Sequence, residues 1–145
     1  MAWRGSPMQP PPSALATMLQ LPVGERRRPY RSAVPTDRRT DAIAALGGSL
    51  RRVDDRVRRW SPSRWAAAGG DGRPRSEAAH ELAVTLAELG RLAGNGAPSQ
   101  APPQVQPYAI ADQLSVLGHE LANAPKAAAH AEAGTAAVER FLAGL

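Results

Sequence analysis

Large apolar residues recur at helical spacing in four stretches of the chain. Between Asp41 and Trp60 they stand three or four positions apart, which places them on one stripe of a helix; they are Ile43, Leu46, Leu50, Val53, Val57 and Trp60. The same spacing returns three more times. The pattern therefore predicts helices near residues 37–60, 76–93, 108–124 and 125–144.

Residues that favour helix ends separate these stretches. Ser61 followed by Pro62 is typical of a helix start, so a short turn is expected there, with Trp65 folding back beside Trp60. Ser76 is expected to cap the second long helix, and Pro125 to take the first position of the last one. The second and the last of the long helices thus have a predicted beginning.

Six leucines on two of the stripes are expected in the core or at an interface. They are Leu82, Leu86, Leu89, Leu114, Leu117 and Leu121. Residues 1–35 show no sustained period and are predicted to form a disordered, basic, proline-rich arm, and residues 94–107 a semi-rigid proline-rich linker. The fold class predicted is all-α, a small bundle of about four helices within residues 36–145.

Charge is distributed unevenly along the chain. Residues 1–75 hold 15 of the 18 basic side chains and six acidic ones, a net charge of +9, whereas residues 76–145 carry −4. A basic first half indicates an anionic partner, such as nucleic acid, anionic lipid or an acidic protein face. Docking of one half of the chain on the other explains the same pattern.

Several classes of chemistry find no support in the sequence. The absence of cysteine excludes a disulfide framework and a cysteine zinc site, and fits a reducing cytoplasm. His80-Glu81 and His119-Glu120 begin like a zinc-protease motif, but neither has a second histidine four residues after the first. We expect no metal, no cofactor and no enzymatic activity. No apolar run approaches the ~20 residues that span a bilayer.

The segment from Leu46 to Val53, Leu-Gly-Gly-Ser-Leu-Arg-Arg-Val, resembles the turn and second helix of helix-turn-helix DNA-binding proteins. The resemblance implies a turn at Gly47 and a recognition helix capped by Ser49. Its exposed side would present four candidate contacts to nucleic acid or another anionic partner: Arg51, Arg52, Arg58 and Arg59. The other interpretation is one continuous packing helix, in which Gly47 and Gly48 together cost about 2 kcal/mol.

Two functions follow from these observations. The leading expectation is a non-enzymatic, cytoplasmic interaction or adaptor protein that binds a partner protein or forms a homo-oligomer, because a thin core leaves apolar stripes to cover. The alternative is a nucleic-acid-binding regulator that uses the Arg-rich segment 46–60. A membrane partner ranks third. The excess of alanine, arginine, glycine and proline is typical of GC-rich bacterial genomes.

Overall fold

The computed structural model describes residues 33–145, with side chains from Asp37 onward. This part of the chain is helical, without strands, as the apolar pattern predicts. Its elements are α2 (Ala33–Val57), α3 (Pro62–Ala66), α4 (Arg75–Leu92), the 3₁₀ turn η1 (Pro107–Ala109), α5 (Ile110–Ala122) and α6 (Ala127–Ala143). The predicted arm lies outside the described residues except for its last three positions, which already belong to α2.

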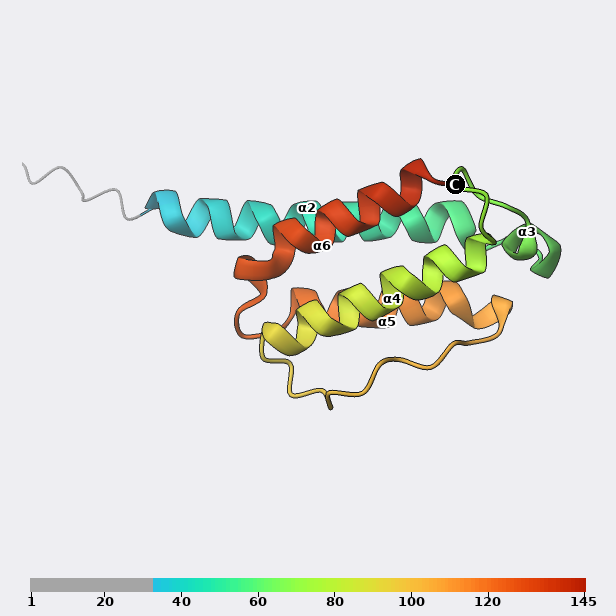
Figure 1. Cartoon of the computed structure of the whole chain (residues 1–145). Helices are drawn as coiled ribbons and strands as arrows, with labels where there is room; N and C mark the ends of the chain where they lie inside the picture. The colour runs from blue at the N-terminus through green and yellow to red at the C-terminus, as the bar shows by residue number, and fades with distance from the viewer. Residues whose placement is uncertain (1–32) are drawn as a thin grey trace, which may run out of the picture. The chain divides into compact units, whose positions relative to one another are not determined.

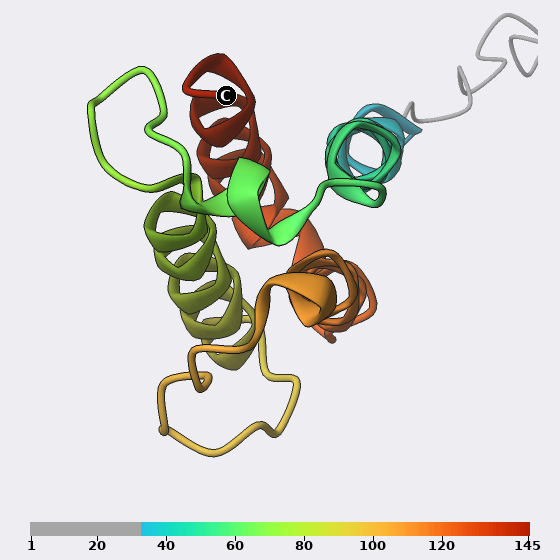
Figure 2. The same cartoon turned by 90° about the vertical axis from the view of Figure 1, so that its right-hand side faces the viewer.

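Four helices form the bundle, with α2 packed on α6 and α5, and α4 packed on the same two helices (Figures 1 and 2). Figure 1 shows that α2 and α6 run in one direction and α4 and α5 in the opposite one. Helices α4 and α5, which follow each other in the chain, are therefore parallel. Their connection has to return along the whole length of the bundle.

The proline-rich segment between α4 and α5 makes this return. An 18-residue helix such as α4 is about 27 Å long, and extended polyproline chain covers about 3.1 Å per residue, so the segment is long enough. Gln113 of α5 donates a hydrogen bond to the carbonyl of Pro103 at 2.8 Å, and Val105 packs against the core. The segment is thus a crossover fastened to the bundle.

Several helices begin or end at other residues than the sequence predicts, because backbone N–H and C=O groups there form other hydrogen bonds. The first helix ends at Val57, three residues before Trp60, and Ser61 caps α3 as expected by accepting from the amide of Arg64. Ser76 lies inside α4, because the carbonyl of Pro74 already accepts the first helical bonds. The last helix begins at Ala127, since the Lys126 amide donates to the carbonyl of Ala93 at the end of α4.

The core consists of the predicted stripes together with many alanines. Of the six predicted leucines, Leu82, Leu86, Leu114 and Leu121 are buried, while Leu89 and Leu117 are partly buried and pack against the core. Trp65 is 1% exposed, and its ring lies 4.9 Å from that of Trp60 in an edge-to-face arrangement, which confirms the predicted pair. The tryptophans close one end of the bundle.

Glycines on α5 and α6 let the helices approach closely. A Cβ atom on Gly134 would lie 2.9 Å from Leu121 and 3.1 Å from Leu46, and one on Gly118 would overlap the side chain of Leu50. These positions belong to the packing between helices.

The two glycines of α2 have no such role. The helix is continuous through Gly47 and Gly48, and a Cβ atom at either position would meet nothing within 4 Å. The helix-turn-helix interpretation of this segment is therefore wrong in its geometry: there is no turn at Gly47 and no second helix for Ser49 to cap. The other interpretation, a continuous packing helix, describes the segment.

We predict opposite effects of alanine at two helical glycines. Gly47→Ala adds a methyl group in open space and should raise the free energy of unfolding by up to about 1 kcal/mol, because alanine loses less backbone entropy. Gly118→Ala should lower it by about 1 kcal/mol or more, because Leu50 has to move away. Chemical denaturation of the two variants checks this, and a destabilised Gly47→Ala protein would contradict the packing described for α2.

Candidate functional site: the α4–α6 cleft and the arginines of α2

The four predicted contact arginines are all exposed, but two of them are neutralised. Arg52 forms an ion pair with Glu139 of α6. Arg58 donates through Nε to Asp54 at 2.9 Å and lies 3.9 Å from Asp112 of α5. The other two of these four arginines, Arg51 and Arg59, have no carboxylate partner within residues 33–145. The arginines therefore do not form one uniformly free cationic face.

Ser49 of α2 lies at the contact between α2 and α6. It is 1% exposed, and its hydroxyl donates to Oε1 of Glu139 at 2.7 Å while accepting from Arg52 at 3.1 Å. A buried hydroxyl needs such partners, because an unpaired one is costly. The polar residue that the sequence suggested as a helix cap instead links two helices of the bundle.

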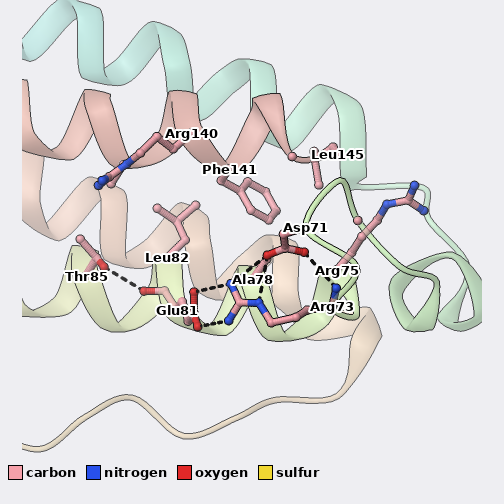
Figure 3. Close-up of a pocket in the computed structure, with 13 residues that line it drawn as sticks. Asp71, Arg73, Arg75, Ala78, Glu81, Leu82, Thr85, Arg140, Phe141 and Leu145 are labelled. Carbon is pink, nitrogen blue, oxygen red and sulfur yellow. Dashed lines mark hydrogen bonds and ion pairs between the residues drawn. The ribbon is translucent and has the colours of Figure 1, made fainter.

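A cleft of about 420 Å³ opens between α4, α6 and the loop that precedes α4 (Figure 3). We call it the α4–α6 cleft. Its apolar lining comes from both helices and the last residue of the chain: Ala78, Leu82, Ala137, Phe141 and Leu145. Leu82 and Phe141 are core residues, so the floor of the cleft is continuous with the core. Charged side chains surround this floor.

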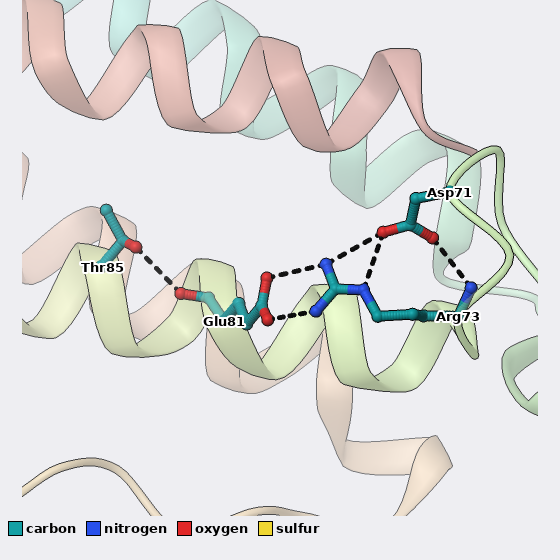
Figure 4. Close-up of polar contacts among 4 residues, drawn as sticks. All are labelled: Asp71, Arg73, Glu81 and Thr85. Atoms are coloured by element: carbon teal, nitrogen blue, oxygen red, sulfur yellow. Dashed lines mark hydrogen bonds and ion pairs between the residues drawn. The ribbon is translucent and has the colours of Figure 1, made fainter.

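Arg73 is fixed between two carboxylates at the edge of the cleft (Figure 4). Its Nε donates to Asp71 at 2.9 Å, and its guanidinium forms a two-point contact with Glu81 of α4 that includes a 3.1 Å hydrogen bond from Nη2. Two-point contacts of this kind define the position of both groups. The loop is thereby held against the first turns of α4.

The same contacts shift the acid–base equilibria of the three groups. The backbone amide and then the guanidinium of Arg73 lower the pKa of Asp71, and hydrogen bonding from that guanidinium lowers the pKa of Glu81. In return, Glu81 and then Asp71 raise the pKa of Arg73. All three side chains are about half exposed, so water and salt weaken the network.

The other end of the loop is fixed to α6. The amide of Gly70 donates to the carbonyl of Gly144 at 2.8 Å, and a Cβ atom on Gly69 would lie only 2.9 Å from that carbonyl oxygen. Gly72 has a φ of 81°, which other residues rarely adopt. The glycine-rich loop thus forms one wall of the cleft, which Gly69 lines.

Arg140 differs from Arg73 in having no fixed partner. It lines the cleft from α6, is exposed, and makes no side-chain hydrogen bond or ion pair within the described part of the chain. Figure 3 shows it on the opposite side of the cleft from Glu81 and Arg73. The cleft therefore combines an apolar floor, a self-neutralised edge and the unpaired Arg140. Arg75 also lines the cleft, but its guanidinium is directed away from Phe141 (Figure 3).

Metal-ligating clusters and membrane-spanning helices are both absent from the described residues. No group of three histidine or acidic side chains among them could hold a metal ion. None of the helices between Ala33 and Leu145 is both long and apolar enough to cross a membrane.

Sequence reasoning did not find the cleft. Asp71 and Arg73 stand two residues apart in a glycine-rich loop, a visible signal for a local pair, but Glu81 and Arg140 join the site only through tertiary structure. Comparison with protein-family models, with curated proteins and with solved structures finds no match for this chain.

We predict that Arg73→Gln destabilises the protein at neutral pH and much less in acid. Asp71 and Glu81 have lowered pKa values, so their stabilising contacts are complete at neutral pH and are lost as the pH falls through the folded-state values. The difference in melting temperature between wild type and Arg73→Gln should therefore shrink between pH 7 and about pH 3.

The exposed, unpaired Arg59 provides the matched control for this titration. Arg59→Gln removes the same charge without breaking a carboxylate contact, so its effect on the melting temperature should change little over the same range. If the difference in melting temperature between wild type and Arg73→Gln stayed constant with pH, the ionised carboxylates of Asp71 and Glu81 would contribute nothing to stability through Arg73.

Proposed function

We propose that the protein is a non-enzymatic helical interaction protein, a cytoplasmic adaptor of a bacterium, which binds a segment of a partner protein in the α4–α6 cleft. The observation that carries this proposal is an open cleft whose floor is apolar and whose walls are fixed. Binding sites of this kind lose little conformational entropy when they are filled.

The walls support the proposal because they are held from both sides. Arg73 connects the loop to α4, and Gly70 connects it to the end of α6. The floor supports it because Leu82 and Phe141 are core side chains, 4% and 7% exposed, that cannot turn away from an incoming group. A partner's side chain would meet a surface that is already arranged.

Charge indicates the kind of segment that fits. Arg73 is already paired with Asp71 and Glu81, and the guanidinium of Arg75 lies over Trp60, so the charge available to a ligand on the cleft floor belongs to Arg140. A segment with one large apolar side chain and an aspartate or glutamate within a few residues would fill the floor and pair with Arg140. Aromatic and aliphatic anchors in such pockets contribute most of the affinity, and the rim charge contributes less.

A peptide display library screened against the full-length protein tests this proposal. Enriched peptides should carry an apolar residue with a nearby acidic one. Ala78→Leu, which fills the cleft from α4, should weaken their binding roughly tenfold or more, and Arg140→Gln roughly fivefold, as expected for a lost anchor site and a lost rim charge.

The control is Ala133→Leu, which places the same side chain on an exposed position of α6 that does not line the cleft. It should bind the selected peptides like wild type. Peptides that bind equally well to the Ala78→Leu protein would refute the cleft as the site. Sedimentation would instead identify the occupant as a second copy of the chain if it showed a dimer that peptide dissociates and that Ala78→Leu does not form.

A further inference from the structure

A second surface lies at the end of the bundle where α2, α3 and α4 meet. Trp60 is half-buried there, and the guanidinium carbons of Arg64 and Arg75 lie 4.7 Å and 5.4 Å from the centre of its ring. Contacts of this kind between arginine and tryptophan hold the cation in place. Arg64 is exposed, whereas Arg75 is half-buried and its Nη1 donates to the carbonyl of Arg64 at 3.4 Å. Figure 3 shows the guanidinium of Arg75 pointing away from Phe141 and the cleft floor.

Positive charge collects in this part of the chain. Residues 56–75 contain six arginines and one acidic residue, Asp71, a net charge of +5, whereas all described residues together carry +1. Two of the six, Arg58 and Arg73, have carboxylate partners. The remaining four have none within residues 33–145: Arg56, Arg59, Arg64 and Arg75.

An exposed aromatic ring belongs to an element that packs against α3, the helix of Arg64. Tyr108 is 82% exposed, the highest value among the large hydrophobic residues on the described surface, and its element η1 packs against α3. The carboxylates of Asp55, Glu77 and Asp112 belong to the adjoining turns of α2, α4 and α5. Asp112 lies 3.9 Å from Arg58, so two carboxylates without an ion pair in residues 33–145 remain beside three unpaired arginines, Arg59, Arg64 and Arg75. We call Arg59, Arg64, Arg75 and Tyr108 the arginine–tyrosine surface.

We propose that the arginine–tyrosine surface binds single-stranded nucleic acid. Arginine contacts phosphate through paired N–H groups, and an exposed aromatic ring stacks on an unpaired base. Duplex DNA hides its base faces, so Tyr108 would add nothing to duplex binding. A lipid surface needs aliphatic anchors, and the other large exposed apolar residues of the described chain, Leu92 and Val116, lie on the other end of α4 and in the middle of α5.

This inference does not depend on the peptide cleft. It also differs from the helix-turn-helix interpretation, because it uses no turn at Gly47 and leaves Arg51 and Arg52 out. A protein with both surfaces would bring a partner segment to a nucleic-acid strand, but each surface can be tested alone.

The test measures binding of the full-length chain to a fluorescent oligothymidine of about 20 nucleotides, long enough for one OB-fold-sized site. Wild type should bind with an affinity that falls as salt rises, because phosphate contacts release counterions. Tyr108→Ala should weaken binding roughly tenfold, and Tyr108→Phe should restore it. Tyr108 is so exposed that neither change disturbs the fold.

Charge variants separate this surface from the basic arm. Arg59→Gln combined with Arg64→Gln should reduce the magnitude of the slope of log K against log salt concentration by about 1.4, the value expected for the loss of two phosphate contacts on a single strand. The control changes two arginines of the arm, Arg26 and Arg27, to glutamine, which removes equal charge and leaves the effect of Tyr108→Ala in place. Heparin, an anion without bases, should bind wild type and Tyr108→Ala equally.

Three results would overturn the proposal. One is equal oligothymidine binding by wild type and Tyr108→Ala, and another is complete loss of binding in the arm variant alone. The third is stronger binding to vesicles with anionic headgroups than to the oligonucleotide. Peptide binding by Tyr108→Ala, measured in parallel, should match wild type, so a failure here is distinct from a failure of the cleft.

Discussion

Two leucines of α2 pack onto glycines of the neighbouring helices, and the rest of the bundle is arranged around these contacts. Leu50 fills the space above Gly118 of α5, and Leu46 contacts Gly134 of α6. Because glycine has no side chain, the helices come close enough for a core rich in alanine to exclude water. The helix-propensity cost of a glycine in a helix, about 1 kcal/mol, is offset here by that packing.

The close approach of α2 and α6 determines what the polar residues between them do. Ser49 is buried by it, so its hydroxyl has to bond to Glu139, and Glu139 in turn neutralises Arg52. Asp112 on α5 acts similarly, though from 3.9 Å, on Arg58. Packing against α6 thus neutralises Arg52, whereas Arg58 pairs first with Asp54 of its own helix.

The parallel course of α4 and α5 has a second consequence. The crossover runs on the α4–α5 side of the bundle (Figure 1). At the start of α4, the glycine loop bonds to the end of α6 and Arg73 connects the loop to α4. That junction opens the cleft on one side and places Arg75 against Trp60 on the other. The two proposed surfaces are therefore neighbours that share a scaffold and adjoin at Arg75, which lines the cleft while its guanidinium lies over Trp60.

Local signals in the sequence determined the helices, their apolar faces and the tryptophan pair, because a period of 3.6 residues and a Ser-Pro cap act within a few residues. They also indicated the six leucines and the proline-rich connection. The sequence could not decide whether α2 turns at Gly47, since an apolar stripe and two glycines suit both outcomes. Only tertiary structure decided it, through Leu46 and Leu50 packing on both sides of that point. The cleft has the same origin: Arg140 belongs to the last helix, far in the chain from Arg73 and Glu81, and only helix packing brings it to their site.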